Sequence, residues 1–162
     1  MLLKKPAYVL FLVASAVATT SFASAQSMKR YHRGNFTNPY QRLAISEIAV
    51  PSLPDIAAVQ LLPNREHVLL YNPALCHKAG PVLCEFYHYH EYGHIVLRHT
   101  QRRDLSRQEK EAEADRWAAQ HAPLPCVIAA YRYFSTGRGG SQLHGTGRSR
   151  AARMIARLEH PI

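Results

Sequence analysis

Acidic residues are scarce in this chain. Its 162 residues include 11 aspartates and glutamates against 20 lysines and arginines, which gives a formal net charge of +9. A basic surface favours anionic partners such as nucleic acid, acidic peptides or lipid head groups. The arginines are scattered, however, and neither an Arg-rich run interleaved with aromatics nor a known nucleic-acid module is present. The composition therefore indicates a solvated basic surface, open to anionic contacts, and no specific nucleic-acid partner is expected.

The chain also lacks an apolar run long enough for a confident membrane span. Its one early apolar stretch, residues 8–18, follows the basic pair Lys4–Lys5 and precedes the small residues 23–25. These features predict a bacterial secretory signal peptide over residues 1–25, cut before Gln26, with an uncleaved N-terminal anchor as the alternative. The expected location of the mature chain is therefore periplasmic or extracellular, without a transmembrane span.

Cysteine is equally sparse, with only Cys76, Cys84 and Cys126. No C-x-x-C pair exists, which argues against a zinc site built from these cysteines. In an oxidising compartment Cys76 and Cys84 could bridge across a turn and fix the entry to the next helix, leaving Cys126 over. The sequence alone leaves that bridge open.

What the chain does contain is one H-E-x-x-H motif, His90–His94. On a helix, residues four apart lie on one face, so the His90 and His94 imidazoles can bind one Zn²⁺. Glu91 sits beside the first ligand, where its carboxylate can act as general base toward the attacking water. Because the chain has ten histidines, two surface histidines on an ordinary helix are the alternative.

A third protein ligand is required, because catalytic zinc sites use three protein ligands and keep one position open. The capping-box pattern Ser106–Glu109 predicts the start of a second helix. Glu111 and Asp115 lie four residues apart on it, so Glu111 can bind the metal while Asp115 accepts a hydrogen bond from a ligand imidazole. Glu113 is the alternative ligand, and a solvated acidic face is the alternative for all these acids.

Turn residues and hydrophobic spacing predict the other elements. A short helix is expected around residues 54–62, and residues 67–71, ended by Asn72-Pro73, have the pattern of a strand. That strand could form the edge of an active-site cleft and accept an extended peptide, or it could be a plain core strand. Helices are predicted over residues 82–98, 106–121, 125–134 and 148–159.

Four further residues lie within or near the motif or could contribute to its site. Gly93 costs the helix about 1 kcal/mol relative to alanine, so we expect it to let another backbone pass close by. His88 and His99 lie off the four-residue spacing and are not expected to bind the main zinc ion. His144 lies on a glycine-rich loop, where it could donate to a developing oxyanion or be an exposed loop histidine.

The two motifs together, His90–His94 and then Glu111–Asp115 in the order E-A-E-A-D, resemble those of the gluzincin metallopeptidases. The resemblance is greatest to the HtpX/CAAX-prenyl-protease-like family, with the ImmA/IrrE-like peptidases second, and covers roughly residues 65–122. It implies an edge strand before the helix, with Glu91 as base, Asp115 as outer partner, and three ligands: His90, His94 and Glu111. The membrane helices of the first family are missing, so the chain looks like a minimal, soluble, secreted version.

The sequence thus predicts a small α+β domain of zincin type over residues 43–162, mostly helical, behind a flexible basic leader at 26–42. Its expected function is zinc-dependent hydrolysis of peptide bonds in a peptide or protein substrate, with endopeptidase cleavage favoured and exopeptidase cleavage open. The alternatives are a catalytically inactive zinc-binding scaffold that acts as a binding or assembly factor, and a basic anion-binding module.

Overall fold

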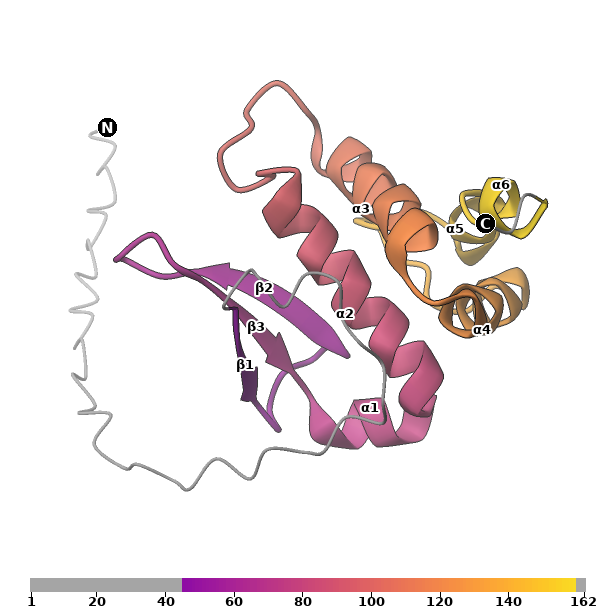
Figure 1. The fold of residues 1–162 in the computed structure, drawn as a ribbon, viewed down its shortest axis with the longest axis horizontal. Helices are drawn as coiled ribbons and strands as arrows, with labels where there is room; N and C mark the ends of the chain where they lie inside the picture. The colour runs from indigo at the N-terminus through magenta and orange to yellow at the C-terminus, as the bar shows by residue number, and fades with distance from the viewer. Residues whose placement is uncertain (1–44, 160–162) are drawn as a thin grey trace, which may run out of the picture. The chain divides into compact units, whose positions relative to one another are not determined.

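The computed structural model describes residues 45–159 (Figure 1). The predicted signal peptide and basic leader lie outside the described residues. The described part is a mixed α+β domain, as expected, with a small sheet and a majority of helix. Its elements are β1 (Ser46–Ala49), β2 (Ala57–Leu61), β3 (His67–Tyr71), α1 (Pro73–Ala79), α2 (Pro81–Val96), α3 (Arg107–His121), α4 (Leu124–Ser135), α5 (Gly147–Ala152) and α6 (Ile155–Glu159).

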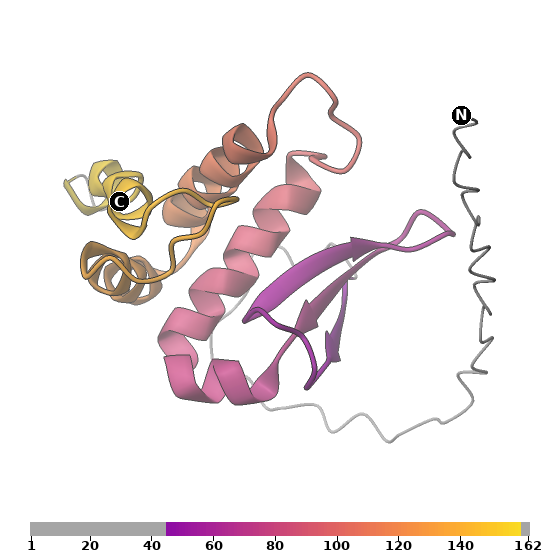
Figure 2. The same ribbon diagram turned by 180° about the vertical axis from the view of Figure 1, so that it is seen from behind.

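The sheet has the order β1-β3-β2, with β1 parallel and β2 antiparallel to β3. The predicted strand at residues 67–71 is confirmed as β3, but it is the central strand and not the edge of a cleft. Residues 54–62 were expected to be helical, and this prediction is wrong, because residues 57–61 pair along their whole length with β3. A short apolar run is ambiguous in sequence, and here pairing with β3 decides its structure. The strand beside α2 is therefore the edge strand β2 (Figure 2).

Helix α1 was not foreseen, because Asn72-Pro73 was interpreted only as the end of a strand. The same two residues also begin a helix. The Asn72 side-chain oxygen accepts hydrogen bonds from the backbone N–H groups of Ala74 and Leu75, and Pro73 occupies the first helical position. The Asn72 amide also donates to the carbonyls of Pro51 and Leu53, at 3.0 and 2.8 Å. One buried asparagine thus ties α1 to the loop between β1 and β2.

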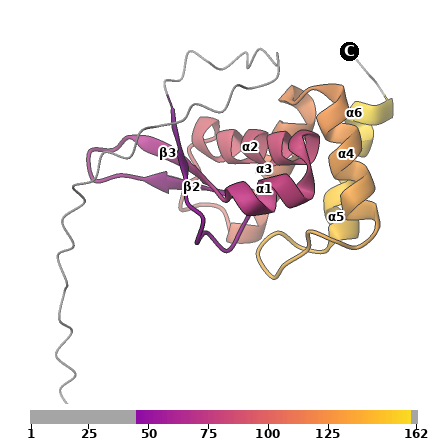
Figure 3. The same cartoon turned by 90° about the horizontal axis from the view of Figure 1, so that it is seen from below.

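Helix α2 lies between the sheet on one side and α3 with α4 on the other (Figures 1 and 3). Every residue from Phe86 to Gly93 on this helix is buried, so both of its faces contact protein. At Gly93 the backbone of α3 passes close by: an added Cβ would lie 3.2 Å from the Ala114 Cα and 3.3 Å from its carbonyl oxygen. Gly93 thus allows a close approach of a neighbouring backbone, as predicted, and this approach sets the separation of the two helices.

The capping box of α3 is confirmed: Ser106 accepts from the Glu109 N–H, and the Glu109 carboxylate accepts from the Ser106 N–H. The single helix predicted over residues 148–159 is in fact two, α5 and α6. Between them, the N–H groups of Arg153 and Met154 bond to carbonyls three residues back, which tightens the turn. This break buries Met154 and directs Arg153 toward α3.

Among residues 45–159, no helix combines the length and the apolar character needed to cross a bilayer. Cys76 on α1 and Cys84 on α2 form a disulfide, and Cys126 is a free thiol buried in the core. The bridge left open by the sequence is therefore present. A disulfide of this kind is compatible with the periplasmic or extracellular location expected from the N-terminal segment.

Candidate metal centre

The His90 and His94 side chains project from α2 toward α3, one helical turn apart. Their Nε2 atoms lie 3.2 Å from each other, and both residues are buried. Glu111 on α3 brings its Oε2 atom to 3.0 Å from His90 Nε2 and 3.5 Å from His94 Nε2. Two helices therefore present three donor atoms to one point.

These distances test whether zinc fits. Four ligands held tetrahedrally at the usual bond lengths of about 2.0–2.1 Å lie about 3.3 Å from one another. The three observed separations, from 3.0 to 3.5 Å, match the edges of such a tetrahedron. Two imidazoles and one carboxylate are also the donor set of many catalytic zinc sites. His90, His94 and Glu111 therefore fit this metal in both geometry and chemistry.

Asp115 fixes the second nitrogen of His90. Its Oδ1 atom lies 2.9 Å from His90 Nδ1, and the carboxylate is fully buried. Arg150 donates to both of its oxygens, at 3.0 and 2.7 Å, and Arg153 donates to Oδ2 at 2.7 Å. Burial disfavours the charged form of this carboxylate, but hydrogen bonding to His90 and the charge of Arg150 outweigh it and hold its pKa well below the usual range. Asp115 is therefore anionic and can orient the His90 ring.

The buried cluster determines the charge on His90 when no metal is bound. Burial alone lowers the pKa of His90, but its hydrogen bonds to Asp115 and Glu111 raise that pKa to about 9. Burial likewise opposes ionisation of Glu111, yet hydrogen bonds from His144, His90 and His94 hold its pKa far below the ordinary value. In the metal-free chain a proton on His90 thus lies where a metal cation would lie.

His94 is supported by a second histidine. His99 Nδ1 lies 2.9 Å from His94 Nδ1, and His99 Nε2 lies 3.1 Å from the Glu113 carboxylate. Arg102 also donates to Glu113, at 3.1 Å. Burial lowers the pKa of His99, which favours a neutral ring that can accept from His94 and donate to Glu113. Of the two glutamates left open by the sequence, Glu111 lies with the motif histidines, whereas Glu113 holds His99.

Glu91, the expected base, is buried beside the middle of edge strand β2. Its Oε2 atom accepts a hydrogen bond of 2.8 Å from the Val59 N–H. Glu91, His94 and Glu111 line one cleft of about 510 Å³ together with Ala57–Val59 of β2. The Glu91 carboxylate therefore faces the same cleft as His94 and Glu111, and the edge of β2 that points away from β3 forms one wall of that cleft.

His144 also reaches the site, although it belongs to the loop before α5. Its Nε2 atom lies 3.0 Å from Glu111 Oε2, and its ring centre lies 5.6 Å from that of His90. Ser141 contacts the other ring nitrogen at 2.8 Å, and Arg153 donates to the His144 carbonyl at 3.2 Å. The structure thus brings His144 into the cleft, where the sequence left an exposed loop position as the alternative.

Sequence reasoning missed the groups that support the site. Arg150 and Arg153 lie 35 and 38 residues after Asp115 and carry no local signal for that contact. The roles of His99 and Glu113 were also missed. The position of His99 just after the helix was the one sequence signal for its contact with His94, but that contact requires the chain to reverse direction there. Arg98, with a φ of 56°, makes that reversal.

No protein-family model matches this chain, and comparisons with curated proteins and with solved structures find no match either. The function of the site therefore has to be inferred from its own geometry.

Proposed function

We propose that this chain is a zinc-dependent peptidase whose metal is held by His90, His94 and Glu111. The observation that carries the proposal is the convergence of these three donors at tetrahedral separations, beside a buried Glu91 that lines one cleft with His94 and Glu111. A metal-binding scaffold without catalysis would need no general base beside its metal. The resemblance of the two motifs to those of the gluzincin peptidases supports this proposal, because it implies the same three ligands and the same base.

Zinc bound at these donors would act as a Lewis acid toward a peptide carbonyl and would lower the pKa of water. Glu91 takes a proton from the attacking water at a carboxylate oxygen and passes it to the leaving amine. Asp115 and His99 keep the two imidazoles oriented through their Nδ1 atoms. His144 lines the same cleft, with Nε2 3.0 Å from Glu111 Oε2, and in this proposal it donates to the substrate oxygen as negative charge develops there.

The substrate in this proposal is an extended peptide that adds to the free edge of β2. The Val59 N–H donates to Glu91 and not to β3, so it faces the cleft. A peptide carbonyl that takes this N–H by β-strand addition would release Glu91 from the bond. Binding of the peptide to the Val59 N–H would then free the Glu91 carboxylate to act as the base. A secreted, periplasmic or extracellular setting is part of the same proposal.

The test is Glu91→Gln in the purified chain, with hydrolysis of a denatured-protein or peptide-library substrate followed by mass spectrometry. Because glutamine keeps the size and the hydrogen bond from Val59 but cannot accept the proton, we expect bound zinc to be retained. The rate should fall by ~10²–10⁴-fold. Exposed Glu66→Gln, which leaves the site untouched, is the matched control. Unchanged hydrolysis in Glu91→Gln would exclude this mechanism, and a zinc-loaded wild type without any hydrolysis would favour the inactive scaffold.

A further inference from the structure

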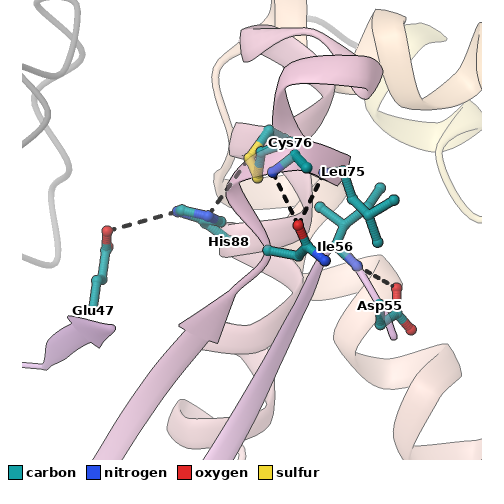
Figure 4. The surroundings of a disulfide bond; sticks show 9 residues. Glu47, Asp55, Ile56, Leu75, Cys76 and His88 are labelled. Atoms are coloured by element: carbon teal, nitrogen blue, oxygen red, sulfur yellow. Dashed lines mark hydrogen bonds and ion pairs between the residues drawn. A yellow bond between two sulfur atoms is a disulfide. The ribbon is translucent and has the colours of Figure 1, made fainter. Parts of the chain in front are cut away.

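Helix α2 carries a second pair of donors four residues apart. Cys84 and His88 lie on the side of the helix away from Glu111, and Cys84 Sγ is 3.6 Å from His88 Nε2. Cys76 on α1 joins them through its disulfide to Cys84 (Figure 4). One donor atom from each of Cys76, Cys84 and His88 lies within 4.8 Å of the other two. This cluster is separate from the His90–His94–Glu111 site.

We propose that Cys76, Cys84 and His88 form a second metal site, which is closed while the disulfide is present and binds Zn²⁺ once it is reduced. Two thiolates and one imidazole are donors that zinc prefers, and three protein ligands leave one position for water. The absence of a C-x-x-C pair argued against a zinc site at these cysteines, but it does not exclude a site whose donors come from two helices. The spacing that matters here is that of Cys84 and His88, with Cys76 supplied by a neighbouring helix. This site is independent of the peptidase proposal.

Contacts of α1 and α2 with the rest of the fold keep Cys76 and Cys84 close together, in addition to the disulfide bond. Asn72 anchors the start of α1 to the carbonyls of Pro51 and Leu53, and the body of α2 is packed in the core. The two Cα atoms lie 5.0 Å apart and Gly80 alone separates the helices. Reduction therefore leaves both thiols on anchored helices beside the same imidazole. Both cysteines are half-buried, so a reductant and a metal ion can reach them.

His88 is already held with its Nε2 atom toward sulfur. The ring is buried and lies beside Tyr71, with ring centres 5.6 Å apart. Its Nδ1 atom lies 3.8 Å from the Glu47 carboxylate on β1, as Figure 4 shows. The Tyr92 hydroxyl donates to the other oxygen of Glu47. At 3.8 Å this contact is an ion pair and is longer than a hydrogen bond. The negative charge near Nδ1 favours a proton on that nitrogen, which leaves the Nε2 lone pair for a metal.

The chemistry balances with a dithiol as the reductant. One thiolate of the dithiol attacks a sulfur of the bridge, and the second releases the other sulfur by closing the dithiol into its own disulfide. Cys76 and Cys84 gain two electrons and two protons. Binding of Zn²⁺ then releases the two thiol protons, because the ligands are thiolates. The metal replaces the covalent link between α1 and α2 by a coordinate one.

The test uses the Glu111→Ala chain, because that substitution removes a ligand of the first site. The protein is reduced with a phosphine, which becomes a phosphine oxide while water supplies the oxygen atom and the thiol protons. Co²⁺ is then added as the probe, because thiolate coordination gives a charge-transfer band in the near ultraviolet that histidine and carboxylate ligands do not give. We expect about one Co²⁺ per reduced chain with this band, and neither in the oxidised chain. Zinc should then displace the cobalt.

Substitutions show which residues give rise to the cobalt charge-transfer band. Cys84→Ser should abolish it, and His88→Gln should weaken cobalt binding by at least tenfold. His77→Gln, which changes an exposed histidine beside Cys76, and Cys126→Ala should leave it unchanged. Burial raises the pKa of the Cys126 thiol to about 12, so this thiol is a poor ligand. A folded reduced chain without the band would overturn the proposal. So would a reduced chain that unfolds and that neither cobalt nor zinc refolds, because a metal site at these helices would restore the fold.

Discussion

The two sides of helix α2 offer a comparison within one element. Toward α3, His90 and His94 meet Glu111, and Asp115 beside them is fully buried and bound by two arginines. Toward α1, the pair Cys84 and His88 meets Cys76, and the nearest carboxylate, Glu47, is partly exposed and 3.8 Å away. The spacing along the helix is the same on both sides, but the neighbours differ.

The difference shows that four-residue spacing supplies proximity, whereas the residues from other elements decide the chemistry. The α3 side holds nitrogen and oxygen donors beside buried charged groups, which suits the permanently bound zinc of the proposed function. The α1 side holds two sulfurs that can bond to each other, so metal binding there depends on the oxidation state. A substitution on one side of α2 leaves the other side unchanged, so the other side is an internal control.

The largest effect is expected from Glu111→Ala. Loss of a carboxylate that completes the three-ligand set should weaken zinc binding at the α3 side by more than ~100-fold, since even outer partners cost ten- to a hundredfold. Zinc content by mass spectrometry after dialysis checks it. Glu113→Gln is the matched control, because Glu113 contacts His99 and not the three donors. An equal loss in both variants would show that the acidic helix acts through general charge and not as a ligand.

Asp115→Asn should have the next largest effect, and it should alter both the metal and the fold. The substitution leaves the buried Arg150 and the half-buried Arg153 without their shared countercharge. Removing one partner of a buried ion pair costs about 3–5 kcal/mol of unfolding free energy. Zinc affinity should also fall by about 10–100-fold. Chemical unfolding and zinc titration measure the two effects. Exposed Asp104→Asn should change neither, and a stable Asp115→Asn chain would show that Asp115 is not the group that holds these arginines.

Part of this arrangement could be predicted from local sequence signals. A capping box, a helical pattern interrupted only by Gly93 and two i,i+4 pairs were sufficient to predict α2, α3 and the proximity of the three candidate metal ligands, because each signal depends on residues close in sequence. The position of β2 at the sheet edge depends on pairing with β3, and Arg150 reaches Asp115 from 35 residues away. His99 returns to His94 through an arginine in the left-handed region, which no residue preference indicates. Such contacts are properties of the packed chain.

The pH dependence of stability separates the metal-free and zinc-loaded forms. The pKa of His90 rises from 6.5 to about 9 on folding without metal. Its protonated form therefore stabilises the fold fully below pH 6.5, and this contribution is lost as the pH rises through about 9. The loss is up to about 3 kcal/mol. In the zinc-loaded chain the sign reverses, because a proton competes with the metal at low pH. Urea unfolding from pH 6 to 10 checks this. A metal-free chain that becomes more stable over that range would contradict the His90 assignment.

His99→Leu should weaken zinc binding by about tenfold, the lower end of the cost of losing an outer hydrogen-bond partner. His99→Asn, whose side-chain oxygen can take the place of Nδ1, should restore much of the affinity, although its link to Glu113 is lost. A purely packing role would give the opposite ranking, because leucine fills the buried volume better than asparagine. Zinc competition titrations on both variants, with the disulfide intact, therefore distinguish orientation of His94 from simple burial.

The smallest effect is expected from Glu47→Gln, and it sharpens the contrast between the two sides. In the oxidised chain no metal occupies the α1 side, and glutamine can still accept from the Tyr92 hydroxyl, so stability and zinc content should hardly change. In the reduced chain, affinity for cobalt should fall by up to about tenfold, because the negative charge 3.8 Å from His88 Nδ1 is lost. The measurement is the same charge-transfer titration, run with Glu66→Gln as the control. A change that appears equally in the oxidised chain would mean that Glu47 supports the sheet, and the comparison between Asp115 and Glu47 as outer partners would then fail.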